Sequence, residues 1–166
     1  MEKKPSIDPI NEIDTISQSQ KDMCQAYGND SIGIIVSGLM WLTSSIGAFQ
    51  FSPKQAVWVL LVGGMLVDPL SVIMYKLIGL SGVHNKGNPL ANLAMEATVW
   101  MLMCIPLAFG LSLQHTEWFF QAMLMIIGGR YLTFASMYGN RLYWILGAVL
   151  GIAAYVLLFF LNLEKS

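Results

Sequence analysis

Three ionisable side chains stand inside long apolar stretches of the sequence: Asp68, Glu96 and Arg130. An ionised side chain near the centre of a bilayer costs roughly 2.5 to 3.5 kcal/mol on insertion scales. Residues of this kind therefore face the interior of a helix bundle or a water-filled cavity, where they pair with one another. Two acids and one base can form a structural ion pair, line a polar pocket or relay a proton.

The depths of the three residues predict a single cluster. Counted from the expected cytoplasmic ends of their segments, they lie roughly 10 to 15 Å into the membrane, at about 1.5 Å per residue. Arg130 is too deep to reach either surface comfortably, and an acid cannot snorkel as far as Lys or Arg. We therefore expect Asp68, Glu96 and Arg130 to meet inside the bundle, with Arg130 bridging the two carboxylates.

Polar residues one or two helical turns away are expected to share the faces of these charges. Side chains three or four positions apart lie on one face of a helix. Pro69 has no backbone donor, so it frees a carbonyl close to Asp68. By helical spacing the cluster gains Ser71 and Tyr75 near Asp68, Asn92 near Glu96, and Thr133 near Arg130.

Two interpretations of the cluster remain open from the sequence if all five segments cross; if the fourth segment did not cross, Arg130 would lie at a surface instead. In the structural one, the groups only pair with one another and lock the bundle. In the functional one, they line a polar pocket or a proton path that opens toward the cytoplasm. One acid then shares Arg130, and the other takes up a proton.

The chain around these charges has the composition of a membrane protein. Of its 166 residues, 55% are hydrophobic and 11% are charged, and the mean hydropathy is +0.59, well outside the range of soluble domains. A spanning helix needs about 20 mostly apolar residues, and short connections favour antiparallel neighbours. The prediction is an all-α membrane protein with a five-helix transmembrane bundle over residues 31–163, with spans at 31–51, 55–78, 90–113, 118–138 and 142–163.

Residues 1–30 are expected to form a cytoplasmic N-terminal segment. Asp8-Pro9 is typical of a helix start. Isoleucine then recurs at every third position, at Ile7, Ile10, Ile13 and Ile16. This spacing predicts a short amphipathic helix, which lies either on the bilayer or bundle surface or against a partner protein.

The distribution of basic residues predicts the orientation, because cytoplasmic loops carry an excess of Lys and Arg. In a five-span topology, one side holds only Lys54 and Lys165. The side of the N-terminus holds Lys3, Lys4, Lys21, Lys76, Lys86 and Arg141. The N-terminus is therefore expected in the cytoplasm and the C-terminus outside.

Glycines indicate where helices approach closely. Gly147 and Gly151 form a small-xxx-small pattern in the last span, typical of close packing within the protein or of a dimer face. Gly63 and Gly64 interrupt the second span and are also expected at a helix contact. The sequence is compatible with a homo-oligomer or with another membrane partner.

Other chemistry has little support in the sequence. A net charge of −1 gives no electrostatic basis for binding nucleic acid. His84 and His115 are expected as solvated loop residues on opposite sides of the membrane, so no metal site and no cofactor are expected. Cys24 and Cys104 differ in depth, which argues against a disulfide. No phosphate-binding, zinc-protease or serine-hydrolase motif is present, and an enzyme is not the favoured function.

Several stretches have unusual intramembrane contexts: Gly63-Gly64-Met65 with Pro69-Leu70-Ser71, Lys86-Gly87-Asn88-Pro89-Leu90, and Glu117-Trp118-Phe119-Phe120 through Gly129-Arg130-Tyr131-Leu132 to Tyr138-Gly139. Across residues 25–160, the chain resembles an uncharacterised bacterial family of small multi-pass membrane proteins. The resemblance implies a bacterial inner membrane as the location. It transfers no catalytic residue, because the family has no assigned activity.

The leading functional hypothesis is transport or permeation of a small solute or a proton, centred on Asp68, Glu96 and Arg130. The alternative is a non-transporting scaffold or accessory subunit in which the cluster is structural. A cavity beside the charges, open to one side, would favour transport. A dry and fully paired cluster would favour the scaffold.

Overall fold

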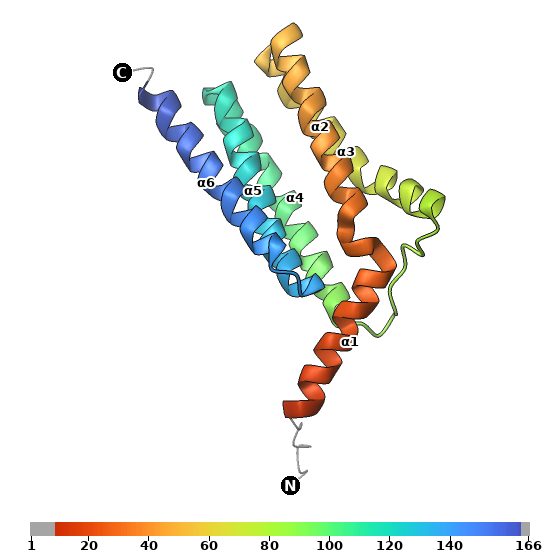
Figure 1. The fold of residues 1–166 in the computed structure, drawn as a ribbon. Coiled ribbons are helices and arrows are strands. Elements are labelled where there is room, and N and C mark those ends of the chain that lie inside the picture. Colours follow the sequence, from red (N-terminus) through yellow and green to blue (C-terminus); the bar gives the residue numbers. More distant parts are fainter. Residues whose placement is uncertain (1–8, 164–166) are drawn as a thin grey trace.

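The computed structural model describes residues 9–163, with side chains described over 15–160. All regular structure in this part of the chain is helical (Figure 1). The elements are α1 (Pro9–Tyr27), the 3-10 turn η1 (Gly28–Asp30), α2 (Ser31–Gln50), α3 (Pro53–Ile78), α4 (Leu90–Gln114), α5 (Thr116–Tyr138) and α6 (Leu142–Leu163). The prediction of an all-α fold is confirmed.

Each of the five predicted spans is a helix, with ends that differ from the predicted ones by at most two residues. Within the described residues, four helical stretches are long and apolar enough to cross a membrane. α5, which carries Glu117, Gln121 and Arg130, is not among them. The four stretches are Thr15–Gln50, Pro53–Ile78, Leu90–Gln114 and Leu142–Phe160.

α1 begins at Pro9, close to the helix start that the sequence predicts. Its amphipathic character stays a prediction. Ile7 and the side chains of Ile10 and Ile13 lie outside the described part of the chain, and Ile16 is exposed.

A tight local distortion joins α1 to α2. The backbone φ is positive at Gly28, Asn29 and Asp30, at 55°, 57° and 53°. A left-handed conformation costs roughly 1 to 3 kcal/mol for a residue other than glycine. The hydroxyl of Tyr143 compensates in part, because it donates a hydrogen bond to the carbonyl of Asn29. The distortion turns the start of α2 and brings Asp30 to the inner side of the molecule.

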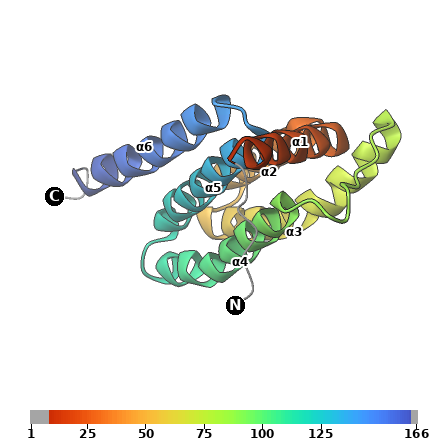
Figure 2. The ribbon, with the colours of Figure 1, turned by 90° about the horizontal axis from the view of Figure 1, so that it is seen from below.

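The helices form two groups. α2 and α3 pack together as a hairpin, whereas α5 lies between α4 and α6 (Figures 1 and 2). α1 contacts the second group at one end: Gln20 Nε2 donates a hydrogen bond to the carbonyl of Ser136 at 2.8 Å. Met23 is buried there in an aromatic cluster with Tyr131, Phe134, Tyr138 and Tyr143.

The two groups also meet at a small apolar core further along the helices. It consists of the buried side chains of Val57 and Leu60 from α3, Ala108 from α4, and Phe119 and Met123 from α5. The space between the groups is therefore bounded by α1 at one end and by this core at a second point.

Small residues set the closest helix contacts. A Cβ atom at Gly147 would lie 2.7 Å from the backbone oxygen of Gly128, so α5 and α6 cross with their backbones nearly touching. In the first group, a Cβ atom at Gly63 would lie 2.9 Å from Met40 Sδ. Gly64 meets nothing within 4 Å, and a Cβ atom at Gly151 would make only an ordinary contact with Met125.

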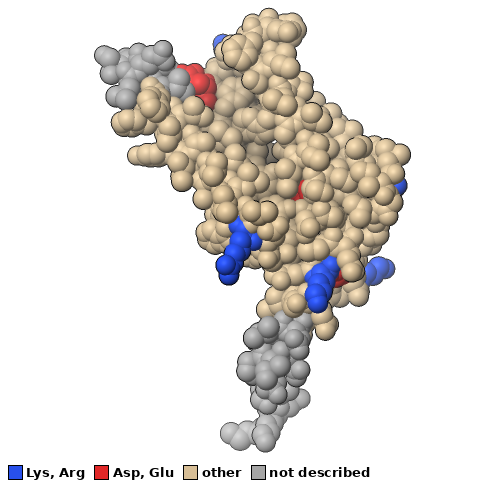
Figure 3. Space-filling model, viewed as in Figure 1, with Lys and Arg blue, Asp and Glu red and all other residues tan. Residues whose placement is uncertain are grey.

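Large apolar side chains cover the outside of the described chain. Phe49, Met65 and Leu77 are 90%, 78% and 75% exposed. Monomeric soluble proteins rarely expose wide apolar surfaces, whereas a membrane protein presents such surfaces to lipid. Most Lys and Arg side chains on the face drawn in Figure 3 lie toward the α1 end, below a broad band with few charges.

We predict that Gly147→Ala lowers the melting temperature of the detergent-solubilised protein. The added methyl group would meet the backbone of Gly128, and overpacking of this kind costs about 1 to 3 kcal/mol. Gly129→Ala is the matched control, because nothing lies within 4 Å of a Cβ atom there. Equal melting temperatures for the two variants would show that α5 and α6 do not cross at this point.

Candidate functional site

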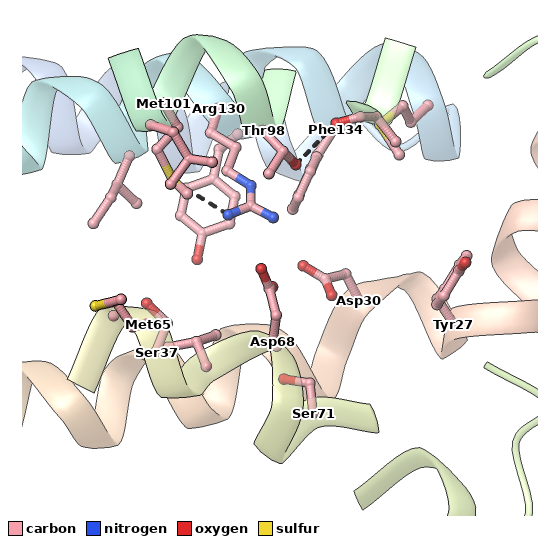
Figure 4. Close-up of a pocket in the computed structure, with 18 of the residues that line it drawn as sticks. Tyr27, Asp30, Ser37, Met65, Asp68, Ser71, Thr98, Met101, Arg130 and Phe134 are labelled. Atoms are coloured by element: carbon pink, nitrogen blue, oxygen red, sulfur yellow. Dashed lines mark hydrogen bonds between the residues drawn. The ribbon is translucent and has the colours of Figure 1, made fainter. Parts of the chain in front are cut away.

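A cavity of about 770 Å³ separates the two helix groups. α2 and α3 line one side, α4 and α5 line the other, and α1 with the loop between α3 and α4 lines one end. Ligand sites in proteins typically have volumes of about 300 to 1,000 Å³. The acidic and arginine side chains in its lining are Asp30, Asp68 and Arg130 (Figure 4).

Arg130 extends from α5 into this cavity and has no carboxylate partner within the described residues. Its Nη1 lies 3.3 Å from the thioether sulfur of Met101, a weak acceptor. Its guanidinium carbon lies 5.2 Å from the centre of the Phe134 ring, a cation–π contact. Its Nε is buried and has no hydrogen-bond partner. A guanidinium has five N–H donors, and within the described residues the one protein acceptor of Arg130 is the Met101 thioether.

Two carboxylates face Arg130 from the opposite wall (Figure 4). Asp68 projects from α3 and is exposed at the cavity surface. Asp30 precedes α2, and its Oδ1 accepts a hydrogen bond of 2.9 Å from the hydroxyl of Tyr75. Ser71, one turn after Asp68, has a buried Oγ without a partner. The wall thus presents two acids to one guanidinium across open space, with the buried Ser71 hydroxyl behind Asp68.

Pro69 shapes this wall from inside α3. Proline has no backbone N–H, so the carbonyl of Met65 lacks its usual donor four residues later. α3 bends along its length (Figure 1), while Tyr75 near its end packs against Ile32 and Val36 of α2. Met65 also lines the cavity. The carbonyl that Pro69 leaves without a donor therefore belongs to a residue of the cavity wall.

The loop between α3 and α4 is fastened to α1 at the end of the cavity. Tyr27 and His84 share a hydrogen bond of 2.8 Å between the phenol oxygen and Nδ1. The backbone N–H of Gly82 donates to the carbonyl of Ala26 at 3.0 Å. Because Tyr27 and His84 both line the cavity, this attachment forms part of its boundary.

Asp22 fastens the same loop further from the cavity. Its Oδ2 accepts hydrogen bonds from Asn88 Nδ2 at 2.7 Å and from the backbone N–H of Asn85 at 3.0 Å. These two bonds, the Asn88 amide first, lower the pKa of the Asp22 carboxyl. A depressed folded pKa contributes stability above the unfolded pKa, and that contribution is lost as the pH falls through the folded pKa. The attachment should therefore weaken only in acid.

The expected buried cluster of Asp68, Glu96 and Arg130 is not present in the described chain. Asp68 and Arg130 line one cavity, but no ion pair joins them, and Asp68 is exposed. Glu96 and Asn92 lie on an exposed face of α4 and do not line the cavity. The inward face of α4 carries Ala94, Thr98, Met101, Leu102 and Ile105 instead.

The polar neighbours divide in the same way. Ser71 and Tyr75 are buried and line the cavity with Asp68, as helical spacing on α3 predicts. Thr133 is half-buried on α5 but is not among the lining residues. Helical periodicity therefore predicts correctly that Ser71 and Tyr75 of α3 line the cavity with Asp68. It does not predict which face of α4 lines the cavity.

Sequence reasoning missed Asp30 and misjudged His84. Asp30 is not among the site residues that the sequence predicts, although an acid directly before an apolar segment is a local signal for it. His84, expected as a solvated loop residue, instead bonds to Tyr27 and lines the cavity. The long-range contact that places it has no local sequence signal.

Metal binding has no visible basis in the described residues. No group of three or more His, Cys, Asp or Glu side chains there is arranged to hold a metal ion. The polar groups of the cavity lining are a guanidinium, two carboxylates, the His84 imidazole and several hydroxyls.

Comparison with known proteins gives one match. Residues 16–166 match the model of a family of unknown function (DUF7010). Neither a curated protein nor a solved structure matches the chain.

Proposed function

We propose that this chain, which belongs to the family of unknown function DUF7010, is a multi-pass membrane protein that binds a small solute in its cavity and moves it across the bilayer. The observation that carries this proposal is the guanidinium of Arg130, which faces a cavity of about 770 Å³ without a carboxylate partner in the described chain. A charge at membrane depth needs a partner or water. A polar ligand or water in the cavity supplies that partner.

The proposal includes five spans, with α5 as the fourth. α5 lies between α4 and α6 and joins them through His115 at one end and residues 139–141 at the other. Because α5 packs side by side with both α4 and α6 (Figures 1 and 2), it would cross the bilayer together with them. Packing against α4 and α6 shields much of its less apolar surface, since Gln121 and Tyr131 are buried.

Charge supports a cytoplasmic N-terminus. In this topology, α1 and the loops at residues 79–89 and 139–141 share one side, which collects most of the Lys and Arg residues. The other side carries Lys54 and Lys165. Cytoplasmic loops are typically enriched in Lys and Arg. The resemblance to a bacterial family supports an inner membrane as the location.

The cavity geometry favours transport over a scaffold. A scaffold gains nothing from an arginine that leaves its donors unused, because a structural ion pair stabilises only when both partners meet. Here Asp68 and Arg130 face one another without a direct pair (Figure 4). The solute site centres on Arg130 with Asp68 and Asp30, whereas Glu96 is exposed on α4 and lies outside the cavity lining.

The topology is tested by cysteine accessibility. In a background lacking Cys24 and Cys104, Gln114→Cys and Arg141→Cys should react with an impermeant thiol reagent from opposite sides of the membrane. Both positions are exposed at the ends of α5, and the remaining basic residues preserve the charge asymmetry. Labelling of both cysteines from the same side would mean that α5 does not cross.

Transport is tested in liposomes containing the purified protein. Proton flux and uptake of a panel of small solutes should give a substrate-dependent signal with the wild type. Arg130→Met and Asp68→Asn should reduce that signal by about tenfold or more, the scale of losing a charged hydrogen bond. Glu96→Gln is the matched control, since Glu96 lies outside the cavity lining.

Melting curves for each variant separate misfolding from loss of transport. A wild-type flux that persists undiminished in both cavity variants would remove Arg130 and Asp68 from the mechanism. No flux with any solute would favour the scaffold.

A further inference from the structure

The N–H groups of the Arg130 guanidinium indicate which chemical group a ligand would carry on the α5 side of the cavity. A guanidinium offers a planar fork of N–H groups, which matches the two oxygens of a carboxylate. Met101 and Phe134 hold the side chain from α4 and α5 without using this fork fully. The buried Nε without a partner shows that the fork is not satisfied by protein within the described chain. The α5 wall is therefore suited to a carboxylate.

The opposite wall selects against a simple anion. Asp68 and Asp30 both point toward the same space as Arg130 (Figure 4), and a lone carboxylate there would be repelled by them. A lone amine would satisfy the acids but would be repelled by the guanidinium. A ligand that carries both charges, with its ammonium toward Asp68 and Asp30 and its carboxylate toward Arg130, meets opposite charge on each wall.

The apolar residues of the cavity lining indicate the chemistry of the uncharged part of the ligand. Beside the charges, the cavity is bounded mainly by apolar side chains, among them Leu61, Met65, Leu102, Ile105 and Ile127. These residues offer no hydrogen-bond partner to a polar substituent, and burying an unsatisfied polar group costs about 1 to 3 kcal/mol. They suit an aliphatic side chain.

We propose that the cavity recognises a zwitterion with an apolar side chain, that is, a free aliphatic amino acid. This inference rests on the proposed function, because it names the class of solute for the same cavity. Arg130 receives the carboxylate, and Asp68 and Asp30 receive the ammonium group. A cavity of about 770 Å³ accommodates such a molecule together with water.

Direct binding to the detergent-solubilised full chain tests this class with three matched probes. Tritiated L-leucine is the zwitterion, 4-methylpentanoate lacks only its ammonium group, and 3-methylbutylamine lacks only its carboxylate. We expect saturable leucine binding, with both single-charge compounds competing about tenfold or more weakly, which corresponds to about 1.4 kcal/mol or more. This comparison uses the wild type and so does not depend on the folding of a variant.

Variants assign the two charges to the two walls. Arg130→Met and Asp68→Asn should each weaken leucine binding by about tenfold or more. Arg130→Lys should lie between wild type and Arg130→Met, because it keeps the charge but loses the planar fork. Glu96→Gln, on the exposed face of α4, should bind leucine as the wild type does.

Several results would overturn the inference. Competition by 4-methylpentanoate as strong as that by leucine, with the same dependence on Arg130, would replace the zwitterion by an anion and leave the solute site itself standing. Leucine binding unchanged by both Arg130→Met and Asp68→Asn would place leucine elsewhere. Absence of binding by all three probes would reject aliphatic amino acids as the ligand class, whereas the flux assay would still judge transport on its own.

Discussion

Hydrocarbon offers no hydrogen bond to a peptide group, so a chain that crosses a bilayer must satisfy its backbone within helices. This constraint explains why the described chain is helical apart from short links, and why side chains such as Phe49 and Leu77 lie on the outside. Packing between helices then depends on small residues, as at Gly128 and Gly147. The same constraint makes every charge at membrane depth expensive, which gives Arg130 its significance in the five-span topology that we propose.

Arg130 faces two acids without touching either, because the helices that carry them belong to different groups. α1 and its attached loop hold the groups together at one end through Tyr27 and His84. The apolar core around Phe119 joins them further along. Between these two points the walls stand apart around a cavity lined by Asp68 and Arg130, and Pro69 interrupts the hydrogen bonds of α3 next to Asp68. Opposite charges and a ligand-sized cavity therefore coincide at one place, which is the basis for assigning a ligand site there.

Much of this architecture could be predicted from the sequence. Apolar length alone gave the five helices to within two residues, and helical spacing placed Ser71 and Tyr75 with Asp68. The rotation of α4 could not be predicted, because this helix is apolar on nearly every side and its most polar residues in the first half, Asn92 and Glu96, lie on the exposed face. Asp30 depends on a left-handed turn at Asn29, and His84 on a contact 57 positions away along the chain. Neither leaves a periodic pattern.

The central claim is that the Arg130 guanidinium faces a hydrated, ligand-sized space instead of a protein carboxylate. A structure of the full chain in lipid nanodiscs that resolves ordered water tests it most directly. The account predicts water or a bound small molecule between Arg130 and Asp68, with no nitrogen and oxygen of the two side chains closer than about 4 Å. A direct Arg130–Asp68 or Arg130–Glu96 ion pair in a closed, dry interface would contradict it.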